Sequence, residues 1–199
     1  MRSEEIYMMW ITHMIFGIFL YFLAVHLGLL PYDIGYLILV GLASLVPDID
    51  HPRSKISKAL RLEKIGMMVE HRGIFHSIYA LLIVSLSTYF IVYYLGYPEK
   101  AFEMGFLVAI GYSSHMISDS LTPSGICWFY PRGKVHGPIK TGSYGELLFL
   151  FIISYFLALV FLASIIGMGV NRDSLLMSFG FSILVSVTME GEVIVRARR

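Results

Sequence analysis

The sequence predicts an all-α integral membrane protein, a bundle of about five to six transmembrane helices. Of its 199 residues, 57% are hydrophobic and only 15% are charged, and the mean hydropathy of +0.73 exceeds that of ordinary soluble domains. Apolar runs of about twenty residues recur along the chain, which is the length that crosses a bilayer core of about 30 Å. The polar residues between the runs gather in a few short motifs. We expect a single domain over residues 1–199.

The first two apolar runs differ in length. Residues 10–30 contain no Lys, Arg, Asp or Glu. This run is longer than the apolar core of a signal peptide and lacks a small-residue cleavage site, so we expect a retained first helix. Residues 34–46 form a short run that stops at Pro47. Because proline disfavours helix at its own position and at the residue before it, we expect irregular backbone for the polar residues that follow, Asp48, Asp50 and His51.

The rest of the chain alternates in the same way. Three further spans are clear and a last one is shorter, at residues 74–97, 101–121, 147–170 and 174–189. The basic segment 53–70 has apolar residues at loose helical spacing, which predicts an amphipathic helix on the membrane surface or a loop that only fixes orientation. Glycine and proline in the connection 122–146 exclude a long helix there. The motifs lie in a core of residues 10–146, and the C-terminal helices of 147–190 follow.

The basic residues fall on one side of this predicted bundle. With both termini in the cytoplasm, thirteen of the fifteen lysines and arginines lie in cytoplasmic segments, and only Lys100 and Arg172 lie on the opposite side. Such a bias is typical of multi-pass membrane proteins. The net charge of +1 gives no general signal for nucleic-acid binding. We therefore expect a multi-pass protein of the inner cell membrane, with membrane lipids and not nucleic acid as partners.

This topology brings three polar motifs to the cytoplasmic face. They are P-D-I-D-H-P at residues 47–52, H-R-G-I-F-H-S at 71–77 and H-M-I-S-D-S-L-T at 115–122. Ionisable groups at membrane segments cost about 2.5–3.5 kcal/mol each on insertion scales, so they indicate function. His13 lies at the same level, whereas His26 lies roughly 20 Å further along the first helix. Imidazoles and carboxylates together suit zinc, manganese or iron, so we expect a metal site on the cytoplasmic side.

The spacing within each motif restricts how its residues bind. His115 and Asp119 are four residues apart and stack on one helix face, where two side chains can hold one ion. His71 and His76 are five apart and diverge by about 140° on a helix, so one sits on non-helical backbone or they serve different ions. The two aspartates of the first motif point apart on regular backbone, and a bridging role between two metals suits one of them. The candidate metal ligands are His13, Asp48, Asp50, His51, His71, His76, His115 and Asp119.

These residues also carry a family resemblance. The chain resembles the membrane-bound metal-dependent hydrolases typified by YdjM in His13-x-x-x-Gly17, Pro47-Asp48-x-Asp50-His51-Pro52, His71-Arg72-x-x-x-His76-Ser77 and His115-x-x-x-Asp119-x-x-Thr122-x-x-Gly125. The resemblance covers residues 10–146. That family is more distantly similar to the all-helical zinc-dependent phospholipases C and P1-type nucleases, which bind zinc with His and Asp and cleave phosphoesters. The resemblance implies an integral-membrane hydrolase.

The expected function is hydrolysis of a phosphoester at the cytoplasmic membrane face by a metal-activated water. Two or more divalent ions, zinc or else manganese or iron, would lower the pKa of water and stabilise the attacking and leaving oxygens. We expect catalytic roles for Asp48, Asp50 and Arg72. The aspartate that is not a ligand accepts the proton of water, and Arg72 clamps the phosphate unless it only fixes topology. Because the site faces the membrane, the expected substrate is a phosphorylated lipid or lipid-like molecule.

A non-catalytic metal-binding membrane transporter or sensor is the alternative. Transporters hold their charged residues near the bilayer midplane, whereas these motifs cluster at one face, which favours the hydrolase. A nuclease is a weaker third possibility, because the sequence shows no basic groove with interleaved aromatic residues outside the one basic loop.

The connection 122–146 offers a cover for the site. Its aromatic triplet at residues 128–130 suits a membrane interface, so the connection would lie over the metal centre as a lid. The single cysteine, Cys127, excludes an internal disulfide, and we expect it to serve packing. His136 and Glu146 either reach the site or serve as a solvated loop residue and a helix-start residue.

Overall fold

The computed structural model describes residues 10–51, 54–61, 72–164 and 172–197 of the chain. Within them the protein consists of α-helices, two short 3-10 helices and one hairpin. The α-helices are α1 (Trp10–His26), α2 (Ile34–Ala43), α3 (Lys55–Leu60), α5 (Ile78–Tyr94), α6 (Pro98–Ser120), α7 (Tyr144–Ser164) and α8 (Arg172–Ala197). The 3-10 helices are η1 (Val46–Asp50) and η2 (Ile74–His76), and the antiparallel strands are β1 (Ile126–Phe129) and β2 (Arg132–Val135).

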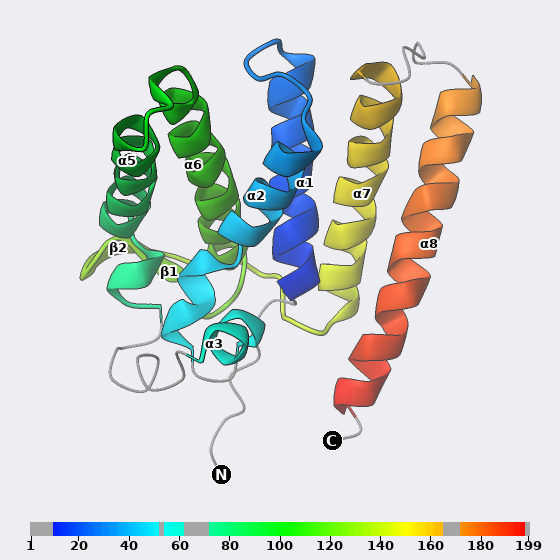
Figure 1. Cartoon of the computed structure of the whole chain (residues 1–199). Coiled ribbons are helices and arrows are strands. Elements are labelled where there is room, and N and C mark those ends of the chain that lie inside the picture. Colours follow the sequence, from blue (N-terminus) through cyan, green and yellow to red (C-terminus); the bar gives the residue numbers. More distant parts are fainter. Residues whose placement is uncertain (1–9, 52–53, 62–71, 165–171, 198–199) are drawn as a thin grey trace.

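The long helices lie side by side and run alternately in opposite directions (Figure 1). The start of α1, the end of α6 and the start of α7 therefore lie at the same end of the bundle as the β-hairpin. We call this end, which also carries η1, η2 and α3, the hairpin end. The turns from α1 to α2 and from α5 to α6 lie at the opposite end. This alternation is the arrangement that the predicted spans require.

Local sequence signals explain several helix boundaries. Asp33 caps α2, where its carboxylate accepts hydrogen bonds from two backbone N–H groups of the first turn. Ser77 caps α5, where its hydroxyl accepts a hydrogen bond from the backbone N–H of Ala80. The helix α1 ends at His26, before the expected residue 30, because Gly28 adopts the left-handed conformation that ends helices, with φ of 71°.

The helix α6 is central to the bundle and packs against α1, α2 and α5. Its buried side chains include Tyr112 and Met116, which have no exposed surface. Gly111 lets α2 come close, since a Cβ atom there would lie 2.6 Å from the carbonyl oxygen of Val40. The close approach brings the end of α2 against the part of α6 that carries His115.

Asp48 and Asp50 of the first polar motif lie in the 3-10 helix η1, so the expectation of irregular backbone was wrong for them, whereas His51 follows η1 on extended backbone as expected. Pro47 lies in its first turn, where the missing N–H leaves no hydrogen bond unmade. A 3-10 helix has three residues per turn, so side chains two positions apart face directions about 120° apart. Asp48 and Asp50 therefore face different sides, as the sequence predicted.

The predicted number of membrane spans is not confirmed by helix length. Among the residues that the structure describes, one helix is both long and apolar enough to cross a membrane, over Tyr144–Ala163. The helices α1 and α5 and the Ser174–Met189 part of α8 are apolar but shorter. Large apolar side chains such as Phe90 of α5 and Leu184 of α8 nevertheless face outward, where a helix in water would be polar.

The two polar segments fold differently from each other. Of the predicted surface helix over residues 53–70, the described part is α3, and residues 62–71 lie outside the described residues. The connection 122–146 has no long helix, as expected, but it forms the β-hairpin, which the sequence did not predict.

Candidate metal centre

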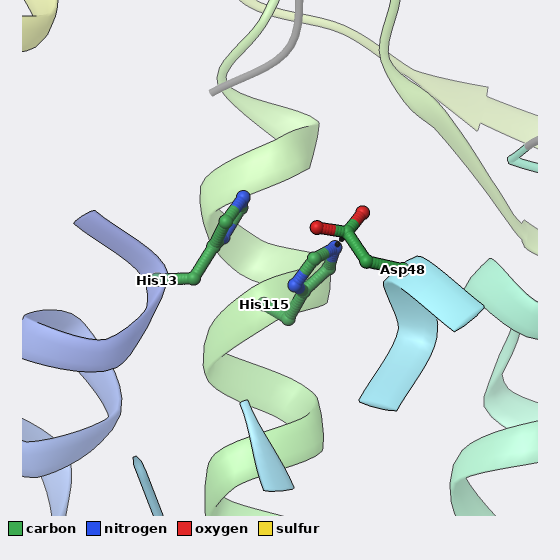
Figure 2. Close-up of side chains that lie close together, drawn as sticks. All are labelled: His13, Asp48 and His115. Atoms are coloured by element: carbon green, nitrogen blue, oxygen red, sulfur yellow. Dashed lines mark ion pairs between the residues drawn. The ribbon is translucent and has the colours of Figure 1, made fainter. Parts of the chain in front are cut away.

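Five of the candidate ligands lie together at the hairpin end, each turned toward the others. The Nε2 atom of His76 lies 3.2 Å from Nε2 of His115 and 3.5 Å from Oδ2 of Asp119. The Nε2 atom of His115 also lies 3.6 Å from Oδ1 of Asp48, and His13 stacks on His115 with ring centroids 3.8 Å apart. Figure 2 shows three of these side chains, which come from α1, η1 and α6.

The ligand atoms form two overlapping groups. In each group the donor atoms lie within 4.8 Å of one another, and His115 belongs to both. The first group is His76, His115 and Asp119, and the second is His13, Asp48 and His115. Because a neutral imidazole offers one lone pair, His115 can serve only one of the two groups at a time.

Hydrogen bonds fix which ring nitrogen of each histidine carries the proton. The Nδ1 atom of His115 lies 2.7 Å from the carbonyl oxygen of Ser44, which can only accept, so Nδ1 is the donor. The Nδ1 atom of His76 lies 3.1 Å from Oδ2 of Asp50. Both rings therefore turn Nε2 toward the shared centre, which is how outer partners orient metal-binding histidines.

The same conclusion holds for His13. Its Nδ1 atom lies 2.6 Å from the hydroxyl oxygen of Ser118. That hydroxyl donates its hydrogen to the carbonyl oxygen of His115 at 2.9 Å, so it accepts from His13. All three imidazoles thus hold Nδ1 in a hydrogen bond and offer Nε2. This pattern fits a divalent metal ion, for which neutral imidazole nitrogens and carboxylate oxygens are ordinary ligands.

The three aspartates differ in exposure and in position. Asp119 and Asp48 belong to the ligand groups, and their side chains are 3% and 20% exposed. Asp50 has no exposed surface and lies behind His76, where it also accepts a hydrogen bond from the backbone N–H of Arg72 at 3.0 Å. We expected Asp50 as a metal ligand or a base, and the structure places it as the partner that orients His76.

Arg72 is turned toward a ligand. Its backbone is left-handed, with φ of 60°, which is uncommon for a residue with a side chain. Its guanidinium donates to Oδ1 of Asp119 through Nη2 at 3.0 Å and to Oγ1 of Thr122 through Nη1 at 3.0 Å. We expected Arg72 to clamp a phosphate, but in the structure it holds the carboxylate of Asp119.

The carboxylates make the centre favourable for positive charge. Burial alone would lower the pKa of His76, but its hydrogen bonds with Asp119 and Asp50 outweigh the burial and raise the pKa to about 9. His76 lies in η2, before the first residue of α5. The electrostatics that favour a charged imidazole at this point also favour a bound cation.

The other sequence candidates lie elsewhere. Among the described residues, neither ligand group contains His51, which is half-buried and follows η1. His71 lies outside the described residues. His26 lies at the opposite end of α1, and His136 is exposed on the segment after the β-hairpin. Glu146 is fully buried and accepts a hydrogen bond from Thr12 at 3.0 Å.

Sequence reasoning missed the two serines that bond to the histidines, Ser44 and Ser118. Ser44 acts through its backbone carbonyl group. Every residue has such a group, so the residue type at position 44 does not predict this hydrogen bond. The role of Ser118 could have been predicted from the sequence, because a residue three positions after His115 lies on the same side of a helix. Glu146 binds Thr12, the neighbour of His13, and so joins α7 to α1 beside the centre.

Comparison with known proteins gives a family. The chain matches the family model described as YdjM inner membrane protein over residues 8–193. It is 34% identical over 114 residues to Inner membrane protein YdjM of Escherichia coli (strain K12), covering 56% of this chain and 57% of that protein. It is 33% identical over 117 residues to Uncharacterized protein YvsG of Bacillus subtilis (strain 168), covering 55% of this chain and 68% of that protein. No solved structure matches.

These matches support a location in the inner membrane, which the name of the E. coli relative states. The alignment spans little more than half of that relative's length. The family model, in contrast, covers most of this chain. The protein therefore belongs to the YdjM inner membrane protein family.

Proposed function

We propose that this protein is a metal-dependent hydrolase that cleaves a phosphoester at the cytoplasmic face of the membrane. One observation carries the proposal. Three imidazoles from separate elements each hold Nδ1 in a hydrogen bond and turn Nε2 toward a centre that also contains Asp119 and Asp48. A set of buried histidines held only for packing has no need of this shared orientation.

The residues divide into ligands and supports. His76, His115 and Asp119 would hold one ion, and His13 and Asp48 would complete its surroundings or hold a second. Zinc fits the ligand set best, and manganese or iron also fits. A bound divalent ion supplies Lewis acidity, which activates water and stabilises negative charge on phosphate oxygens.

Asp48 is the best candidate for the general base. It is the most exposed of the three aspartates, so a water molecule and a substrate can reach its carboxylate. Asp119 is held by Arg72, and Asp50 is occupied by His76 and by the backbone of Arg72. Asp48 would accept the proton that water loses during attack, while Arg72 and Asp50 keep the ligands in position.

The surroundings favour a lipid-like substrate. The span-length helix α7 begins at the hairpin end, which supports a position of the centre close to one surface of the membrane. Phosphorylated headgroups are present at that depth. A metal-binding transporter or sensor is the competing function, and the experiment below separates the two.

Hydrolysis by the purified protein tests the proposal. The wild type in nanodiscs, loaded with zinc or manganese, is expected to cleave bis-para-nitrophenyl phosphate or phospholipids. Asp48→Asn should lower the rate by about 10²–10⁴-fold, the usual contribution of a general base, and should keep the metal held by His76, His115 and Asp119. Glu99→Gln, an exposed carboxylate at the opposite end, should leave the rate unchanged.

A different result would favour the alternative. If the metal-loaded wild type cleaves neither substrate, while His76→Ala and Asp119→Asn abolish metal binding, the centre binds metal without hydrolysis. A transporter or sensor would then be the better account. Unchanged metal content in both variants would remove the metal centre itself.

A further inference from the structure

The β-hairpin carries exposed aromatic and basic side chains that the proposed hydrolysis does not use. Phe129 at the end of β1 is 60% exposed. The basic residues Arg132, Lys134 and Lys140 are also exposed. Phe129 and Arg132 are directly paired across the two strands, so the β-hairpin presents a ring and a positive charge on the same face.

The charge of this segment is one-sided. Between Asp119 and Glu146 the sequence contains no Asp or Glu, whereas it contains two lysines and one arginine. No acidic neighbour in the segment can therefore neutralise the cations. Such a surface is complementary to anionic groups, and basic residues beside a membrane span attract anionic lipids.

The base of the β-hairpin is fixed to the end of α6. The indole Nε1 of Trp128 donates to Oγ of Ser120 at 2.9 Å, and Ile126 is 1% exposed. After β2, the backbone N–H of Gly137 donates to the carbonyl oxygen of Thr122 at 3.0 Å. A Cβ atom on Gly137 would lie 2.6 Å from the carbonyl oxygen of Leu121, so the contact is close. The tip thus extends from a rigid base.

The β-hairpin lies at the end of the bundle where α7 begins. It runs crosswise to the long helices, beside the lower end of α5 (Figure 1). The chain that leaves it enters α7, whose span-length apolar part begins at Tyr144. A membrane crossed by α7 would have one surface at this level, and the β-hairpin would run along that surface.

We propose that the tip of the β-hairpin docks onto the headgroup layer of anionic phospholipids in the membrane that holds the protein. Phe129 enters the interface, where aromatic rings are favoured, and Arg132 and Lys134 bind lipid phosphates. Docking holds the metal centre at a fixed depth, because Thr122, at the base of the β-hairpin, also bonds Arg72. Lipid docking does not depend on hydrolysis by the centre.

A fluorescent probe at the tip tests this docking. In a Cys127→Ser background, Phe129→Cys is labelled with bimane, whose ring replaces the phenyl ring. The protein is placed in nanodiscs of phosphatidylglycerol with phosphatidylcholine, or of phosphatidylcholine alone. We expect strong quenching by lipid that is spin-labelled near the headgroup, weak quenching by aqueous iodide, and loss of the lipid quenching when phosphatidylglycerol is omitted.

Charge variants provide the matched control. Arg132→Glu with Lys134→Glu should abolish the lipid quenching, while Arg132→Lys with Lys134→Arg should keep it. Circular dichroism of each variant checks that the helices remain. Quenching by iodide but not by lipid would place the tip in water, and shielding from both would indicate a protein partner. Equal lipid quenching for all variants and for both nanodisc compositions would show that anionic headgroups are not recognised. Each of these three results would overturn the proposal.

Discussion

Asp50 shows how a buried carboxylate shapes the centre without belonging to a ligand group. Asp50 accepts hydrogen bonds from Nδ1 of His76 and from the backbone N–H of Arg72. It therefore fixes both the imidazole ring and the backbone segment just before His76. Carboxylates behind metal-binding histidines commonly set ring orientation and basicity.

Asp50→Asn is expected to weaken metal binding by about 10–100-fold, the usual effect of losing such a partner. The amide is nearly the same shape, but its oxygen is a weaker acceptor than a carboxylate for the Nδ1 proton. Isothermal titration of zinc into the purified protein measures the change. Glu99→Gln again serves as the control, and equal affinities for the two variants would contradict the role of Asp50.

At the level of single residues, the sequence was informative about which side chains meet but not about their separate tasks. The resemblance and the charge bias pointed to His13, His76, His115 and Asp119, which lie together. They did not distinguish Asp48 from Asp50, because that difference depends on the 3-10 turn of η1. The role of Arg72 likewise depends on a left-handed backbone that its side chain does not favour.

At the level of helices, the contact between α2 and α6 supports the centre. Gly111 lies one turn before His115 on α6, and a Cβ atom there would meet the carbonyl oxygen of Val40 at 2.6 Å and Cβ of Ala43 at 2.7 Å. The carbonyl of Ser44 that orients His115 comes directly after these residues of α2. A larger distance between α2 and α6 would therefore weaken the hydrogen bond that orients the imidazole of His115.

Gly111→Ala is expected to destabilise the protein by about 1–3 kcal/mol through overpacking, partly offset by alanine's better helix propensity of about 1 kcal/mol. Gly180→Ala on α8 is the matched control and should be neutral or stabilising, because within the described part of the chain the added methyl group meets no atom within 4 Å beyond its own stretch of helix. Thermal unfolding in detergent, monitored by circular dichroism, compares the stabilities of the two variants with that of the wild type. A similar shift in both variants would argue against close packing of α2 and α6.

The elements were predictable to different degrees. Long apolar runs indicated α1, α5, α6, α7 and α8, since such periodic segments have strong signals. The β-hairpin was not predicted, because its two-residue turn, Tyr130 and Pro131, is not one of the glycine-containing pairs that signal a hairpin. Its short strands hold their shape through contacts with the end of α6, which local sequence does not reveal.

For the whole molecule, the alternating helices and the distribution of basic residues predict one orientation in the membrane. The hairpin end carries Lys134, and the opposite end carries the turn that contains Tyr97. Thirteen of the fifteen basic residues lie in segments assigned to the cytoplasm, and such segments resist translocation.

Labelling of single cysteines tests this orientation. In a Cys127→Ser background, Tyr97→Cys should react with a membrane-impermeant maleimide added to spheroplasts. Lys134→Cys should react only after the cells are broken, because the distribution of basic residues predicts that its end faces the cytoplasm. Both positions are exposed in the structure, so burial would not explain a failure to react. Reaction of both from the same side would contradict the alternating arrangement.

The hydrogen bonds at Nδ1 of the three imidazoles have a consequence for metal exchange. Their partners are Ser44, Ser118 and Asp50, all supplied by the folded chain. The rotamers are therefore fixed during folding, and little conformational entropy is left for an incoming ion to remove. Ions should be able to leave and return while the helices stay in place, so cellular supply and ion size, not refolding, would select which metal resides there.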